Sequence, residues 1–69
     1  MTMIEVRIRY TEDADSQPFC FVPFGQQNAV VSEIKEKGVY FEGNLEFYTR
    51  HQYVSDMDRV FLEIVVGEE

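Results

Sequence analysis

The chain has 69 residues, with 13 acidic residues against six lysines and arginines, which gives a formal net charge of −7. A chain of this length forms one domain, here residues 1–69, and buries only about 60% of the surface that its unfolded form exposes. Oligomerisation or a partner can therefore contribute to its stability. The negative charge argues against direct binding to nucleic acid or to an anionic membrane surface, and it favours a protein partner with a basic surface.

Cysteine usage and hydropathy exclude further classes of protein. Cys20 is the only cysteine, so an intrachain disulfide and a cysteine-based zinc site are excluded. It lies between Phe19 and Phe21, where we expect a buried structural thiol. No segment joins a basic start to a long apolar run, so the sequence predicts neither a signal peptide nor a membrane span. The expected location is the cytoplasm, and a homodimer is left open.

The first predicted elements form a hairpin. Alternating apolar side chains predict a strand over residues 3–10. A polar loop rich in turn-forming residues follows over residues 11–18, and a return strand is expected over residues 19–24. Pro23 cannot donate a hydrogen bond to a β-ladder, so this second strand should lie at a sheet edge or end at that residue.

The only candidate helix spans residues 26–37. Val30, Val31 and Ile34 recur at helical spacing, and Gly38 stands where a C-cap residue with positive φ is needed. The helix is short and its apolar stripe is narrow. We therefore expect it to cover one face of a small sheet.

Residues 39–50 alternate in hydropathy on both sides of Gly43. A two-residue turn at Gly43 and Asn44 would mix the two faces, whereas a three-residue loop over residues 42–44 pairs Phe41 with Leu45. We expect that loop, or one long strand bent at Gly43, with the odd-numbered positions facing the helix. Residues 50–58 are predicted to be a polar crossing.

The final strand is expected over residues 59–67. Both of its faces are apolar, which is typical of a strand in the middle of a sheet. Its only equal is the strand over residues 3–10. We therefore expect the two ends of the chain to pair in the centre of the sheet.

This order predicts an α+β fold with a small mixed or antiparallel sheet of four to five strands and one helix packed on one face, in ββαββ order. Together with residues 39–45 and 60–66, the order resembles the ubiquitin-like β-grasp. The resemblance implies an N-terminal hairpin crossed by a helix, with the last strand inserted parallel to the first. The family's modifiers end in Gly-Gly, whereas this chain ends in Gly67-Glu68-Glu69, so conjugation and sulfur carriage are not supported.

No residue pattern indicates catalysis or metal binding. His51, the serines and the aspartates are the residue types of a nucleophilic triad, but nothing marks a nucleophile on a strained turn. The acidic stretch over residues 12–15 lacks the turn glycine and closing glutamate of a calcium loop, and His51 has no second zinc ligand at a suitable spacing. We predict a protein that is not an enzyme, with no catalytic residue, metal or cofactor.

The predicted binding surface is the sheet face opposite the helix, where aromatic side chains would act as anchors and carboxylates would steer a partner. The residues assigned to it are Tyr40, Glu42, Glu46, Tyr48, Phe61 and Val65, together with Glu12, Asp13 and Asp15 of the acidic loop. The leading hypothesis is an acidic protein–protein interaction module that docks on a basic protein surface, such as a small phage-type inhibitor that mimics DNA. The alternatives are a β-grasp accessory subunit of a multicomponent enzyme and a small ligand- or metal-binding protein.

Overall fold

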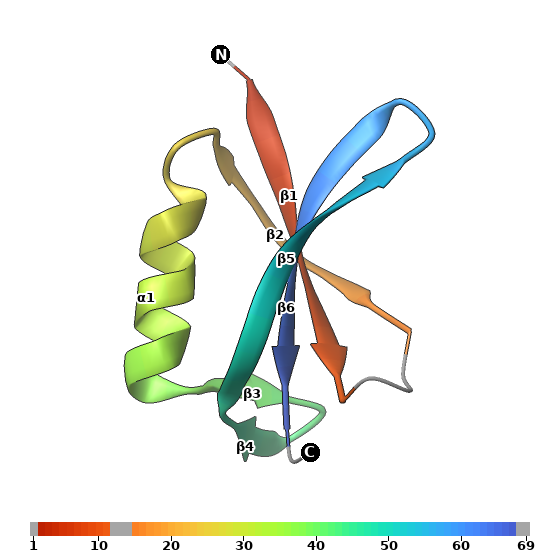
Figure 1. The fold of residues 1–69 in the computed structure, drawn as a ribbon. Helices are drawn as coiled ribbons and strands as arrows, with labels where there is room; N and C mark the ends of the chain where they lie inside the picture. Colours follow the sequence, from red (N-terminus) through yellow and green to blue (C-terminus); the bar gives the residue numbers. More distant parts are fainter. Residues whose placement is uncertain (1, 12–14, 68–69) are drawn as a thin grey trace.

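The computed structural model describes residues 2–11 and 15–67, and within them it contains six strands and one helix. Four strands form a mixed sheet in the order β2-β1-β6-β5, and two short strands form a separate sheet (Figure 1). The predicted α+β class with one helix is confirmed. The elements are β1 (Met3–Tyr10), β2 (Gln17–Pro23), α1 (Gln27–Lys37), β3 (Val39–Phe41), β4 (Asn44–Glu46), β5 (Tyr48–Asp56) and β6 (Arg59–Val66).

The two ends of the chain pair in the centre of the sheet, as predicted. β1 and β6 run parallel, in register from Glu5 opposite Phe61 to Tyr10 opposite Val66. β2 and β5 flank this pair, each antiparallel to its neighbour. All residues of β6 from Leu62 to Val66 are buried, so both faces of this part of the strand are covered, which explains why it is apolar on both faces. β2 lies at an edge and ends at Pro23, in agreement with the constraint that proline imposes.

The core lies between α1 and the face of the sheet that it covers. Gly38 ends the helix at φ 77°, and its amide donates a hydrogen bond to the carbonyl oxygen of Ile34, at 2.8 Å. A Cβ atom on Gly38 would lie 2.8 Å from the carbonyl oxygen of Glu46, so only glycine allows the helix to end this close to β4. The buried core residues are Ile4, Val6, Ile8, Val31, Ile34, Leu62, Ile64 and Val66.

The predicted three-residue loop over residues 42–44 is wrong. Phe41 pairs with Asn44, which leaves a two-residue turn of Glu42 and Gly43. Both turn residues have positive φ, 52° and 85°, which is the turn geometry that matches the natural twist of a hairpin. β3 and β4 pair only with each other and do not join the four-stranded sheet.

The predicted polar crossing over residues 50–58 is also wrong, because most of this stretch is strand β5. It pairs antiparallel with β6 from Arg50 opposite Val65 to Asp56 opposite Arg59. An edge strand has one strand neighbour and tolerates polar side chains, so the hydropathy pattern that marks a buried strand is missing here. The described residues therefore follow a ββαββββ order and not the predicted ββαββ order.

Candidate functional site

The central strands part at one end of the sheet. Pairing between β1 and β6 begins at Glu5 and Phe61, so Met3 and Ile4 have no partner in β6. β6 nevertheless continues its pairing with β5 as far as Arg59. Two-stranded ribbons twist more strongly than wide sheets, and Figure 1 shows the β5–β6 hairpin leaning away from the start of β1. A gap therefore opens inside the sheet, between two strands that are neighbours elsewhere.

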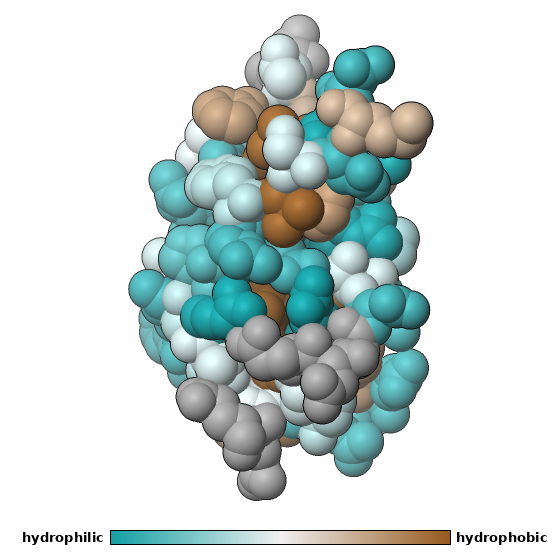
Figure 2. Space-filling view, turned by 45° about the vertical axis from the view of Figure 1, so that its right-hand side comes forward, coloured by the Kyte–Doolittle hydropathy of each residue, from teal (hydrophilic) through white to brown (hydrophobic). Residues whose placement is uncertain are grey.

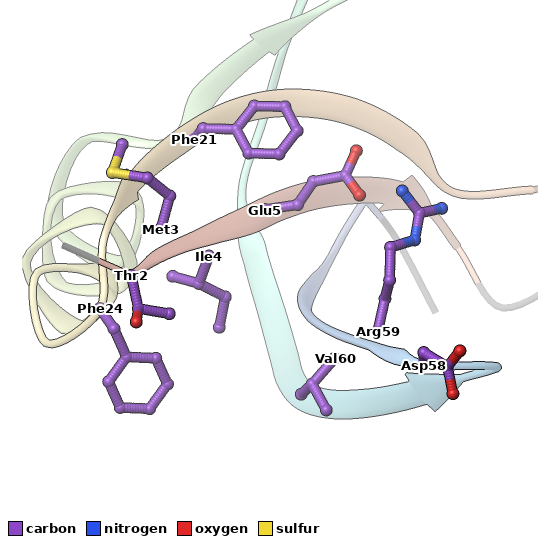
Figure 3. A pocket seen from close by; sticks show the side chains of 9 residues that line it. All are labelled: Thr2, Met3, Ile4, Glu5, Phe21, Phe24, Asp58, Arg59 and Val60. Carbon is purple, nitrogen blue, oxygen red and sulfur yellow. The ribbon is translucent and has the colours of Figure 1, made fainter.

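Apolar side chains line this gap, which is a cleft of about 340 Å³. In Figure 3, Ile4 enters the cleft from β1 and Val60 from β6, and Phe21 and Phe24 stand on its outer sides. The full lining is Thr2, Met3, Ile4, Glu5, Phe21, Phe24, Asp58, Arg59 and Val60. Four of these side chains are large, apolar and at least half exposed: Met3 at 50%, Phe21 at 61%, Phe24 at 63% and Val60 at 52%.

The two walls of the cleft are held differently. On one side, the amide of Phe24 donates a hydrogen bond to the carbonyl oxygen of Thr2, at 2.8 Å, which fixes the end of the first hairpin against the start of β1. On the other side, Val60 pairs with Ser55 of β5 and has no partner in β1. The first wall is therefore tied to the rest of the sheet, whereas the second belongs to a hairpin that projects from it.

The rim of the cleft carries two carboxylates and one guanidinium group. Glu5 accepts a hydrogen bond from Nη1 of Arg7, at 3.1 Å, so its charge is partly balanced. Asp58 and Arg59 lie on the hairpin side. The lining has a formal charge of −1, from two acids and one base, and this agrees in sign with the whole chain.

The sheet face opposite α1 carries all four arginines of the sequence. Arg7 and Arg9 of β1 lie opposite Glu63 and Val65 of β6, Arg50 of β5 also lies opposite Val65, and Arg59 stands an even number of residues before them in β6. The guanidinium carbon of Arg7 lies 5.2 Å from the centre of the Phe61 ring, a cation–π contact. Figure 2, turned toward this face, shows a largely hydrophilic surface with small apolar areas between polar side chains.

Glu63 is the central acid of this face, and its side chain is 2% exposed. Its Oε2 accepts a hydrogen bond from Nη2 of Arg9, at 3.1 Å, and its Oε1 accepts one from Nε2 of Gln52, at 2.9 Å. A buried carboxylate needs such partners, and this arrangement supplies both a charge and an amide. The face is therefore organised around ion pairs and not around exposed aromatic side chains.

The predicted exposed face of aromatic and acidic side chains does not form. Val65 is 1% exposed, and Arg9 and Arg50 lie opposite it on the two neighbouring strands. The aliphatic stem of an arginine at such a position can cover apolar surface. Phe61 is half-buried beside Arg7. Tyr48 is half-buried against the core, with its hydroxyl group 2.7 Å from Nδ1 of His51.

The other predicted binding residues lie elsewhere on the surface. Tyr40 is 75% exposed and Glu42 is exposed, but both belong to the β3–β4 hairpin, where Glu46 is half-buried. Asp15 is exposed, whereas Glu12 and Asp13 lie outside the described residues. All three lie in one hairpin, away from the arginine-bearing face, but Tyr40 is on the opposite face of that hairpin from Glu46, because Glu46 pairs with Val39 and Tyr40 pairs with Leu45. A role for any of these residues in partner binding stays a prediction.

The sequence did not identify the residues of the cleft as a site. Met3, Phe24 and Val60 lie at strand ends, where the alternating pattern reads as an ordinary strand beginning or ending. Burial or exposure of these side chains depends on where β1 and β6 part. No pattern in one sequence encodes that point directly, although three aromatics within residues 19–24 are more than one edge strand can bury.

Within residues 2–11 and 15–67, no group of three or more His, Cys, Asp and Glu side chains is placed to hold a metal ion. In the same part of the chain, the one helix is too short and too polar to cross a membrane. Comparisons with models of protein families, with curated protein sequences and with solved structures found no match.

Proposed function

We propose that the chain is a non-enzymatic protein-interaction module, and that the cleft between β1 and β6 receives an apolar side chain of a basic protein segment. The observation that carries this proposal is the set of four half-exposed apolar side chains around a hollow of about 340 Å³. Aromatic and methionine side chains are enriched in the centres of protein interfaces, where a few of them provide most of the binding energy.

Charge supports a basic partner. The lining of the cleft is net acidic, and the chain as a whole carries −7. Lysine or arginine residues beside the inserted apolar side chain would approach the carboxylates of Asp58 and Glu5 at the rim. Such steering acts mainly on the association rate and weakens as salt is added. An apolar anchor with flanking bases is thus the ligand chemistry that the cleft fits.

Of the finer predictions, the fold architecture stays a proposal and DNA mimicry does not. A ubiquitin-like β-grasp architecture is supported by the parallel pairing of β1 with β6 and by the helix that follows the first hairpin, whereas the separate β3–β4 sheet departs from it. DNA mimicry needs a row of acids on one exposed face, and the face opposite α1 instead carries arginines. We therefore do not extend the proposal to DNA mimicry or to a phage inhibitor. The cytoplasmic location stays a prediction.

The proposal is tested by affinity capture with matched variants. Phe24→Ser and Val60→Ser each remove an exposed apolar side chain from the cleft. The control is Met57→Ser, which removes a side chain that is 96% exposed at the turn of the β5–β6 hairpin and does not line the cleft. A protein captured by the wild type should bind each cleft variant about tenfold more weakly, the usual effect of losing one anchor. The Met57→Ser variant should bind the captured protein as tightly as the wild type does.

The partner is then purified and its dissociation constant is measured by calorimetry over a range of salt concentrations. We expect a basic protein whose affinity falls as salt is added. A partner that binds the cleft variants as tightly as the wild type would overturn the proposal. So would a capture in which the wild type retains nothing beyond what Val60→Ser retains.

A further inference from the structure

The two edges of the four-stranded sheet differ in how they are protected. β2 contains Pro18 and Pro23, which block pairing with another strand. β5 contains no proline, glycine or lysine. Within the described part of the chain, the backbone of residues 51–56 pairs only with β6. A long edge strand without such protection is a template for another strand.

No helix or strand among the described residues covers the outer edge of β5. Figure 1 shows α1 to one side of β5, where it packs on a face of the sheet and does not lie along this edge. Tyr53 is 51% exposed, and its hydroxyl group accepts a hydrogen bond from Nε2 of Gln27, at 3.0 Å. This bond ties the middle of β5 to the helix, so the edge is held in place and still accessible.

We propose that a second copy of this chain pairs with β5 in antiparallel orientation, about a two-fold axis at Tyr53, so that the two sheets become one. A two-fold axis perpendicular to the sheet keeps each side chain on its own face, so paired residues must have the same parity. A bulge between Tyr48 and Arg50 limits the regular ladder to Arg50–Asp56. The midpoint of that segment is Tyr53.

The charges of the edge strand suit this register. With the axis at Tyr53, Arg50 lies opposite Asp56 of the second copy, and the pair occurs twice. Arg50 also has a partner within its own chain, and a guanidinium group has five N–H donors with which to serve both. β5 carries one arginine and one aspartate, so its formal charge is zero in a chain of −7. The overall repulsion between two copies is therefore weakest along this edge.

The expected dimer is weak and depends on concentration. A ladder of this length forms about six to eight backbone hydrogen bonds between the two copies, and side-chain pairs add to them. The cleft lies on the other side of β6 from β5, so dimerisation leaves it open. Failure of the dimer and failure of partner binding at the cleft are therefore separate results.

The first test is sedimentation equilibrium of the full chain from low micromolar to near-millimolar concentration. Asp56→Arg places like charges opposite each other twice and should weaken dimerisation about tenfold or more. The control Asp58→Arg changes the net charge equally, but at a turn outside the ladder, and should have little effect. A wild type that stays monomeric throughout, or a dimer that tolerates Asp56→Arg as well as Asp58→Arg, would overturn the proposal.

Asp56 also lies opposite Arg59 in the ladder between β5 and β6 of its own chain, so Asp56→Arg could act by loosening that hairpin. The double variant Arg50→Asp/Asp56→Arg keeps this change and restores opposite charges across the axis. We expect it to recover most of the lost association. If both variants are monomeric, the charge pairing between copies is wrong.

The register is tested by disulfide formation in a Cys20→Ser background. Residues directly opposite in an antiparallel pair have Cα atoms about 4.5–5.5 Å apart, which a disulfide can span. Tyr53→Cys should therefore oxidise to a covalent dimer, because the residue faces its own copy. His51→Cys faces Ser55 of the second copy and should oxidise much more slowly. Equal rates for the two variants would contradict the register.

Discussion

Along β1 and β6, the half in which the two strands pair (the closed half) and the half in which they have parted (the open half) have similar side chains but differ in burial. In the closed half, Leu62 and Ile64 are fully buried and Val65 is 1% exposed. In the open half, Ile4 still reaches the core, at 3% exposed, but Met3 and Val60 are about half exposed, at 50% and 52%. Both halves alternate in the same way along the same two strands. Apolar character alone therefore does not decide burial in this protein, and the cover that neighbouring elements supply does.

The cover of the closed half comes from both faces. Val31 and Ile34 of α1 pack on one face, and the ion pairs around Glu63 close the other. At the open half, α1 has only just begun, because the chain turns at Gly25 before entering the helix. The β5–β6 hairpin extends beyond this cover (Figure 1), which leaves the cleft between its base and β1. A short helix cannot cover both halves of the sheet.

Truncation of one side chain in each half should give the largest difference. Leu62→Ala removes a side chain with no exposed surface and should lower the free energy of unfolding by about 2–5 kcal/mol, from lost burial and the cavity left behind. Val60→Ala, in the same strand, should lower it by less than about 0.5 kcal/mol. Urea unfolding followed by circular dichroism measures both. Equal losses would show that the cleft is closed in solution.

Removing one partner of the buried carboxylate should give the next largest effect. Arg9→Met leaves Glu63 with Gln52 as its remaining partner among those described above, and should lower the free energy of unfolding by about 1–3 kcal/mol. The double variant Arg9→Met/Glu63→Met buries no charge there and should recover much of the loss. Chemical denaturation of both variants is the measurement. A double variant less stable than Arg9→Met would contradict this account of the closed half.

Gly67 ends the closed half, and replacing it should cost about 1–2 kcal/mol. It has φ 102°, and a Cβ atom there would lie 2.8 Å from Cε1 of Tyr10. Gly43→Ala is the matched control, because Gly43 also has positive φ but has no atom within 4 Å of the added carbon. Thermal unfolding should show a greater loss for Gly67→Ala. If the two variants lose the same stability, the close contact at Gly67 does not contribute to the loss.

The smallest effect concerns the thiol of Cys20, which packs beside the core on β2. Partial burial raises its pKa above the ordinary value, because burial disfavours the thiolate. The unfolded chain therefore loses this proton at a lower pH than the folded chain does. The contribution to stability is fully present below the unfolded pKa and is lost as pH rises through the folded pKa.

Cys20→Ala should remove this part of the pH dependence. Stability is compared for the wild type and the variant from neutral to alkaline pH. The wild type should lose stability more steeply through the range where thiols titrate. Parallel curves would mean that the thiol is as well solvated in the folded chain as in the unfolded chain.

Strong periodicity explains which elements were predicted correctly. The strand over residues 3–10 and the helix within residues 26–37 agree with β1 and α1, because each buries one regular face. β5 was missed because its side chains mix polar and apolar types on an edge with one strand neighbour. The turn of β3–β4 was misplaced because Glu42 adopts positive φ, which a residue other than glycine adopts infrequently.

The candidate site was predicted much less well than the fold. Val65 was expected at the surface from its parity alone, but it is buried, with Arg9 and Arg50 opposite it on the two neighbouring strands. Phe61 was expected to be an exposed anchor, and it lies under Arg7 instead. Long basic side chains reach across a sheet face from neighbouring strands, and one-strand patterns do not record such contacts.

The sequence by itself determined the α+β class, the central pairing of the two chain ends, the single helix of the described residues and the acidic charge, because these follow from local periodicity and composition. Only the tertiary structure decided which ends of the strands stay open, which face carries the arginines and which edge is unprotected. These properties depend on how neighbouring elements cover a residue. Cover of that kind is set by packing between segments that are distant in the chain.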